Sequence, residues 1–142
     1  MKKTFIITMA VLLMMISIVP VYGISHSATP RYGNVIFKES TFEISDSGLA
    51  EVVAKYEGYS YTFWVTISIK LERRALFNWE IVENGCYNNI YTEESSATSG
   101  CTTYTFQLNK KGLYRATIEY SIYGNGGYEP DYITDVIEYQ YT

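Results

Sequence analysis

The side chains of this sequence that could carry out acid–base chemistry are carboxylates in two groups. Glu93 and Glu94 are adjacent, and Glu129, Asp131 and Asp135 follow one another near the end of the chain. A carboxylate pair can act as general acid and base in a small hydrolase. The second group could also offer oxygen ligands to calcium, but its spacing is not that of a known calcium loop. We favour solvated loop and strand-face charges for both groups.

The usual base of nucleophilic catalysis is missing from the predicted domain. His26 is the only histidine, and it lies before the first predicted strand of the domain. A Ser–His or Cys–His pair therefore has no base there. We expect no cofactor, no metal and no enzymatic activity, with a small carboxylate hydrolase as the alternative.

The two cysteines, Cys86 and Cys101, are expected to form a disulfide. Two cysteines in an exported chain pair with each other in an oxidising compartment, and no CxxC redox spacing is present. The segment between them is polar and rich in Ser and Thr. A bridge across it would contribute about 3 kcal/mol in the chain-entropy description.

Tyrosine is unusually abundant, with 15 in the chain. Three at inward strand positions are expected in the core, and others fall in turns or at polar-facing positions. The inward set is Tyr56, Tyr114 and Tyr120; the outward set is Tyr59, Tyr61, Tyr87, Tyr91, Tyr123, Tyr128 and Tyr132. Exposed tyrosine offers a large contact area at low entropy cost and a hydroxyl group. It is also a strand former that tolerates solvent, so exposure alone does not require binding.

The candidate binding residues are Tyr87, Tyr91, Tyr123, Tyr128 and Trp64. Trp64 alternates out of phase with the apolar face of its strand. It therefore either packs at the edge of the core or belongs to a binding surface.

Residues 1–23 are typical of a cleaved secretory signal peptide. Lys2 and Lys3 precede an apolar run that ends before Pro20, and small Gly23 is a plausible cleavage point. Cleavage after Ala28 and retention as a membrane anchor are the alternatives, although the run is short for a spanning helix. We expect a secreted or envelope-associated protein with no membrane span after cleavage.

The charge balance argues against polyanionic partners. Loss of Lys2 and Lys3 with the signal leaves nine basic and 15 acidic residues, a formal charge of −6. Nucleic acids and anionic membranes are bound through Lys and Arg, so we expect neither as partner. An acidic surface also simply keeps a secreted protein soluble.

The mature chain shows the two-residue period of β-strands from residue 34 to 142, after a polar lead-in over 24–33. In the clearest strand, Tyr61 to Leu71, alternate residues from Phe63 onward are apolar, which places one face on a core. The other expected inward sets begin at Val35 with Phe37, at Ala50, at Tyr104 and at Tyr114. Turn signals separate them, among them the Gly-Asn-Gly-Gly run at 124–127. About seven such strands predict an all-β antiparallel sandwich, with a barrel as the alternative.

The stretch from Lys110 to Tyr114 resembles the approach to strand F of immunoglobulin-like domains. Gly112 and Tyr114 match the tyrosine corner, in which the Tyr hydroxyl bonds a nearby backbone group, while Lys110 replaces the usual acid. Ala116 stands where antibody domains have their second core cysteine. The resemblance implies an immunoglobulin-like sandwich without the inter-sheet disulfide of that family.

Residues 31–142 also resemble a group of small uncharacterised exported proteins of Gram-positive bacteria. The shared features are Arg31 with Tyr32, Leu71 with Arg73, Trp79, and the stretch from Lys111 to Arg115. This resemblance implies an export-linked sandwich and no known activity. We therefore expect a secreted, non-catalytic domain that binds a protein or a cell-wall glycan, with a hydrolase or a secreted toxin or signalling protein as alternatives.

Overall fold

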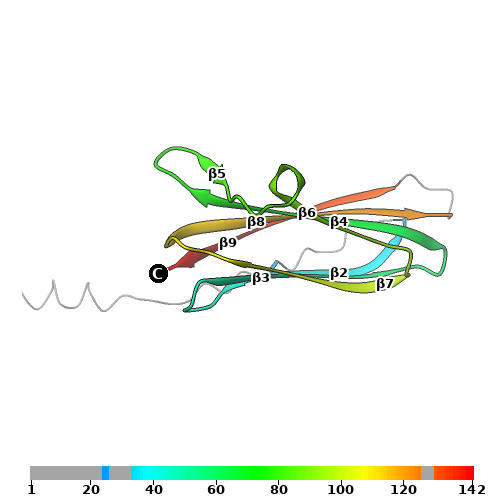
Figure 1. Ribbon diagram of the computed structural model, residues 1–142. Helices are drawn as coiled ribbons and strands as arrows, with labels where there is room; N and C mark the ends of the chain where they lie inside the picture. Colours follow the sequence, from blue (N-terminus) through cyan, green and yellow to red (C-terminus); the bar gives the residue numbers. More distant parts are fainter. Residues whose placement is uncertain (1–23, 26–32, 126–129) are drawn as a thin grey trace, which may run out of the picture.

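Most described residues of the computed structural model lie in β-strands (Figure 1). The structure describes residues 24–25, 33–125 and 130–142. The predicted signal peptide, Tyr128 and Glu129 lie outside the described residues.

The strands form two antiparallel sheets. The first, called the β3 sheet, has the order β1-β2-β3-β7; the second, called the β8 sheet, has the order β5-β4-β8-β9, with β6 pairing the same edge of β4 as β5. In the β3 sheet the strands are β1 (Ile24–Ser25), β2 (Val35–Ile44), β3 (Leu49–Gly58) and β7 (Ser99–Gln107). In the β8 sheet they are β4 (Thr62–Arg74), β5 (Trp79–Ile81), β6 (Ile90–Ser95), β8 (Gly112–Gly124) and β9 (Asp131–Tyr141).

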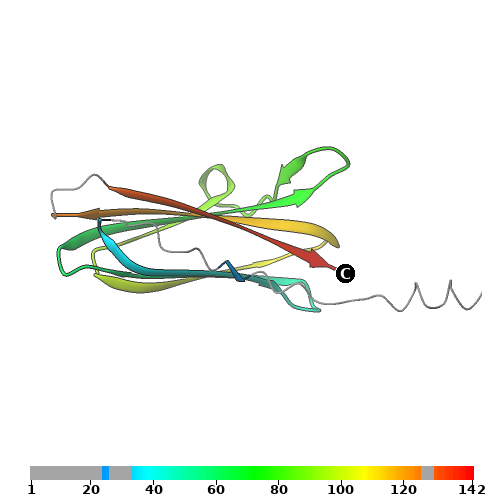
Figure 2. The ribbon, with the colours of Figure 1, turned by 180° about the vertical axis from the view of Figure 1, so that it is seen from behind.

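The order of the strands is that of an immunoglobulin-like sandwich. In chain order β2, β3 and β7 take the places of strands A, B and E, and β4, β8 and β9 take those of C, F and G. Strand β6 pairs β4 as strand C′ does. The predicted all-β immunoglobulin-like sandwich is confirmed, and the two layers are seen edge-on in Figures 1 and 2.

Alternating apolar residues of both sheets meet in one core. From β4 and β8 come Ile67, Ile69, Leu71, Ala116, Ile118 and Ile122, and from β2 and β3 come Phe42, Ile44, Val52 and Ala54. Each is at most 5% exposed. The period of two in the sequence thus marks the buried face correctly over the middle of each long strand.

The alternation fails at the ends of two strands, where the pairing register shifts. Shifts occur between Val35 and Phe37 in β2 and between Thr62 and Trp64 in β4. A bulge inserts one residue and re-aims the side chains beyond it. The predictions that Phe37 and Phe63 face the core are therefore wrong, and each is 48% exposed.

Two segments predicted as irregular contain strands. Ile24–Ser25, within the predicted lead-in, pairs with Ser40 and Thr41 of β2. The segment between the cysteines holds a short 3₁₀ turn, η1 (Tyr87–Asn89), and strand β6, and it crosses from the β8 sheet to β7 in the β3 sheet.

The bond that defines a tyrosine corner is present at the start of β8. The buried Tyr114 hydroxyl donates to the backbone carbonyl of Lys110 at 2.6 Å. Gly112 lies between them with φ +145°, a conformation that L side chains rarely adopt. The corner fixes the turn that carries the chain from the β3 sheet to the β8 sheet.

Replacing Tyr114 by Phe is expected to remove this bond and leave the fold intact. Because the Lys110 carbonyl lies at an exposed turn and can be hydrated, the loss in the free energy of unfolding should be about 0.5–1.5 kcal/mol. Urea denaturation measures it. The matched change of Tyr87 to Phe, at a side chain 88% exposed, should stay within about 0.5 kcal/mol of wild type. Equal effects of the two changes would contradict the role of the corner.

Candidate functional site

Three aromatic side chains share one end of the outer face of the β8 sheet. Trp64 lies directly opposite Tyr123, and Tyr132 lies opposite Ser121, two residues from Tyr123 on the same face. The Tyr123 and Tyr132 rings meet edge to face at 6.5 Å, with their hydroxyls 3.5 Å apart. Trp64 is 39% and Tyr132 67% exposed. We call Trp64, Tyr123 and Tyr132 the outer aromatic cluster.

The chain around this cluster is fixed by hydrogen bonds to the start of β2. The Tyr61 hydroxyl donates to the Gly33 carbonyl, and the Thr62 hydroxyl donates to the Asn34 carbonyl, each at 2.6 Å. Both carboxylate oxygens of Asp131 accept backbone N–H groups, from Gly33 at 3.2 Å and Asn34 at 2.6 Å. These bonds hold the β3–β4 turn and the first residue of β9 against one another.

Polar side chains continue the same face away from the cluster. Cross-strand pairing aligns Thr66 with Ser121, and Ser68 with Glu119, which in turn lies opposite Thr134. Beyond them a cleft of about 550 Å³ is bounded by η1 and floored by Ser68, Thr92 and Glu119. In Figure 1 the η1 turn rises above the β8 sheet on the side away from the β3 sheet.

Asparagine side chains hold the η1 turn in shape. Asn84 donates through its amide to the Asn89 carbonyl at 3.2 Å and accepts from the Cys86 N–H at 3.0 Å. Asn88 and Asn89 have φ of 52° and 57°, the left-handed conformation that Asn tolerates better than most residues. Tyr87 projects from this turn and is 88% exposed.

The predicted disulfide is absent, and both cysteines are free thiols. Cys101 is exposed on the outward-facing side of β7, like Thr103 and Thr105, whereas Cys86 is partly buried beside η1. The segment between them is ordered instead by the pairing of β6 with β4 and by the Asn84–Asn89 contacts. A bridge is not what holds it.

The candidate binding residues fall into different environments. Trp64 and Tyr123 lie together, and Tyr132, which was among the outward tyrosines but not among the candidates, completes their cluster. Tyr91 lies on the inward face of β6, where its ring stacks on Tyr104 at 4.7 Å, and burial raises its pKa above the usual value. Tyr132 lies beside Tyr123 because of the pairing register of β8 and β9. The alternation of apolar residues within one strand does not predict that register.

The described carboxylates of the two candidate acid–base groups do not converge. Glu93 and Glu94 are exposed neighbours on β6, so they point to opposite faces. Asp131 accepts the backbone bonds described above, and Asp135 is buried in an ion pair. Among the described residues no group of three or more His, Cys, Asp or Glu side chains could hold a metal ion.

The ion pair of Asp135 is part of a buried polar cluster between the sheets. Asp135 replaces an apolar residue between Ile133 and Ile137 on the inward face of β9, and its Oδ1 pairs with Lys38 Nζ from β2. The Ser40 hydroxyl donates to Asp135 Oδ2 at 2.7 Å and lies 2.7 Å from the Tyr120 hydroxyl. We call Lys38, Ser40, Tyr120 and Asp135 the buried polar cluster.

No family, curated protein or solved structure matches this chain. In the described part of the chain, no helix has the length and apolar character needed to cross a membrane.

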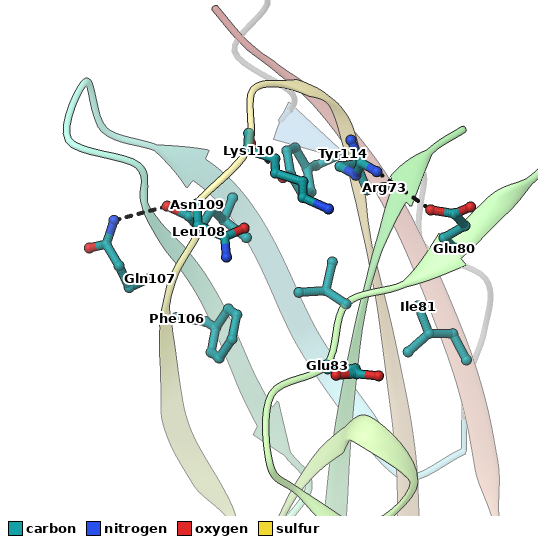
Figure 3. Close-up of a pocket in the computed structure, with 11 residues that line it drawn as sticks. Arg73, Glu80, Ile81, Glu83, Phe106, Gln107, Leu108, Asn109, Lys110 and Tyr114 are labelled. Carbon is teal, nitrogen blue, oxygen red and sulfur yellow. Dashed lines mark hydrogen bonds and ion pairs between the residues drawn. The ribbon is translucent and has the colours of Figure 1, made fainter. Parts of the chain in front are cut away.

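A second cleft, of about 430 Å³, opens between the sheets at the opposite end (Figure 3). Arg73 and Glu80 form an ion pair of 3.5 Å at its rim, and Leu108 and Tyr114 also line it. Lys110 and Tyr114, which form the tyrosine corner, are among its lining residues. We therefore assign this cleft a structural role at the turn between the two sheets.

Near this end, Trp79 is covered by an arginine that is held by a carboxylate. The Arg115 guanidinium lies 4.4 Å from the Trp79 ring centroid and bonds Glu72 at 2.7 Å. This hydrogen bond from Arg115 is the largest cause that holds the pKa of Glu72 below its ordinary value, and Lys70 adds to it.

The free state of the two cysteines can be tested directly by counting reactive thiols. Unreduced, denatured protein is expected to react with two equivalents of a thiol reagent, counted by the mass added per chain. Replacing Cys86 and Cys101 by Ser should each lower the count by one and change the unfolding midpoint little. Zero reactive thiols before reduction, with two after it, would restore the disulfide.

The lowered pKa of Glu72 predicts a pH dependence of stability. An acid whose pKa is lower in the folded than in the unfolded chain stabilises the fold above its ordinary pKa, near 4.5, and this contribution is lost as the pH falls through the folded value. The Glu72→Gln variant should therefore have a lower free energy of unfolding than wild type at neutral pH, and its stability should fall less steeply than that of wild type below about pH 5. Glu80→Gln removes a carboxylate that is 54% exposed and is the control for the loss of one negative charge; it should cost less free energy of unfolding at neutral pH than Glu72→Gln. Identical profiles for Glu72→Gln and wild type would contradict the assignment.

Proposed function

We propose that this protein is an exported, non-catalytic module that binds a cell-wall glycan on the outer face of its β8 sheet. The observation that carries the proposal is the outer aromatic cluster, in which the exposed Trp64 and Tyr132 and the partly buried Tyr123 lie beside a row of hydroxyl groups on the sheet.

The chemistry of this face suits a sugar chain. Aromatic faces can cover the apolar C–H faces of sugar rings, and Tyr and Trp do so with little loss of side-chain entropy. Thr66, Ser121 and Thr134 carry hydroxyl groups that both donate and accept, as sugar hydroxyls require. These residues form a cross-strand neighbourhood with Trp64, Tyr123 and Tyr132.

The cleft beside η1 extends the face. Its volume of about 550 Å³ is in the range of small-molecule sites, and Asn88 and Glu119 line it together with the hydroxyl groups of Ser68 and Thr92. A glycan that stacks on the outer aromatic cluster can continue along the polar row of β4 and β8 toward this cleft. The predicted signal peptide supports a location outside the cell.

A protein partner is the second candidate, supported by a different surface. Leu76 and Phe77, at the tip of the β4–β5 hairpin, are 85% and 89% exposed. In Figure 2 this hairpin projects from the β8 sheet at the end where β9 reaches the C-terminus. Large apolar side chains at this exposure are common in protein contacts.

The test is co-sedimentation of the purified mature protein with protein-free Gram-positive sacculi. Replacing both Trp64 and Tyr132 by Ala should weaken binding about tenfold or more, because aromatic side chains at the centre of a contact commonly contribute more than 1.4 kcal/mol. Circular dichroism checks that the variants remain folded.

Phe77→Ala is the matched control, since it removes a more exposed aromatic side chain from the other end of the molecule. It should leave sedimentation with sacculi unchanged. A wild-type protein that stays in the supernatant overturns the glycan proposal. Loss of binding in Phe77→Ala with none in the double variant would place the contact on the hairpin.

A further inference from the structure

We propose that Lys38 and Asp135 are the two halves of an intramolecular amide bond, formed within the folded protein, that joins β2 of one sheet to β9 of the other. The pair belongs to the buried polar cluster and plays no part in the proposed glycan site.

The burial of this pair is the first observation. The Lys38 and Asp135 side chains are 8% and 5% exposed, whereas the Lys55–Glu39 pair, 3.1 Å apart on the surface, is 49% and 35% exposed. Charges removed from water are disfavoured unless they are paired and hydrogen-bonded, and this pair is held away from water in contact with the Ser40 hydroxyl. A neutral amine beside a carboxylic acid is the reactive pair of amide formation.

The local backbone directs Lys38 into this position. The alternation of β2 that buries Phe42 and Ile44 also turns Ser40 and Lys38 inward, and the register shift between Val35 and Phe37 begins only beyond them. Lys38 and Ser40 thus face a β9 position that would otherwise hold an apolar residue. Apolar packing between the sheets alone does not require a lysine and an aspartate at these inward positions.

The hydroxyl groups of the cluster orient the carboxyl group. Ser40 has one hydroxyl proton, and it is donated to Asp135 Oδ2. The Tyr120 hydroxyl is therefore a donor, to Ser40 or to the Glu39 carbonyl at 3.1 Å. Burial raises the pKa of Tyr120, which keeps that proton in place. Oδ1 faces the amine and Oδ2 faces Ser40, so the two carboxyl oxygens have different roles.

The reaction balances without another reactant. The Lys38 ammonium transfers a proton to Oδ1, and the nitrogen lone pair then forms a bond to the Asp135 carboxyl carbon. A second proton passes from nitrogen to Oδ1, and the bond between carbon and Oδ1 breaks, its electron pair leaving with the oxygen as water. Oδ2 becomes the amide oxygen and keeps its bond from Ser40, and the third proton remains on the amide nitrogen. Holding both groups in contact supplies the large effective concentration that intramolecular reactions have.

Intact mass spectrometry of the wild-type protein is the test. The full chain is expressed and exported, its mature N-terminus is determined, and its mass is compared with the mass of that sequence after reduction. The expected mass is lower by one water molecule. Trypsin, which does not cut after an acylated lysine, should then yield one branched peptide that links Lys38 to Asp135.

Variants separate the bond from other losses of water. Lys38→Met and Asp135→Ala should each show the full sequence mass, and Lys55→Met should retain the loss. Tyr120→Phe keeps the ring and removes a positioning hydroxyl, so the linked fraction should form more slowly, as followed by mass against time.

Two results would overturn the proposal. One is a folded wild-type protein of full mass whose Lys38 and Asp135 peptides are recovered separately. The other is a loss of water that maps elsewhere, for example to a cyclised aspartate. Because the measurement is made on the wild-type chain, it does not depend on whether a variant folds.

Discussion

A buried polar contact ties the two sheets together where β2 faces β9, beside the edge-to-face contact of Phe42 and Tyr139. Asp135 interrupts the apolar series of β9, and Lys38 approaches it from the other sheet. A buried ion pair is stable only if its hydrogen-bonding groups are satisfied, and removal of one partner leaves an uncompensated charge. Ser40 and Tyr120 supply those bonds from β2 and β8. The position of β9 against β2 therefore depends on all four side chains.

A register shift lies beside both the interior cluster and the exterior aromatic surface. In β2, Lys38 continues the inward series of Ser40 and Phe42, and the shift next to it leaves Phe37 exposed. In β4, the shift leaves Thr62 buried and Phe63 exposed, next to Trp64, which faces outward by the alternation that buries Val65. Bulges of this kind re-aim side chains at strand ends and bend the strand locally. Both shifts lie at the end of the sandwich where the β3–β4 turn meets the start of β2.

The sequence pattern predicts the fold well because alternation over long strands has one interpretation. The inward series from Val65 to Leu71 and from Tyr114 to Ile122 are both buried. The pattern cannot show a bulge, since Phe37 and Phe63 continue the alternation and yet face solvent. It also cannot show strand register, which places Tyr132 beside Tyr123. The cysteine prediction was wrong because spacing says nothing of the face on which Cys101 lies.

Strand β9 connects the two proposals physically. Its outward side chain Tyr132 belongs to the proposed glycan surface, and its inward side chain Asp135, three residues along, reaches across to Lys38. The glycan proposed for this surface would pull on the outer face of the β8 sheet, and β9 is the last strand in the order that the described residues form, paired with β8. Such a strand can be peeled from its neighbour one hydrogen bond at a time. The covalent link proposed at Asp135 would stop that peeling, because it would transfer the load to β2 and so to the opposite sheet.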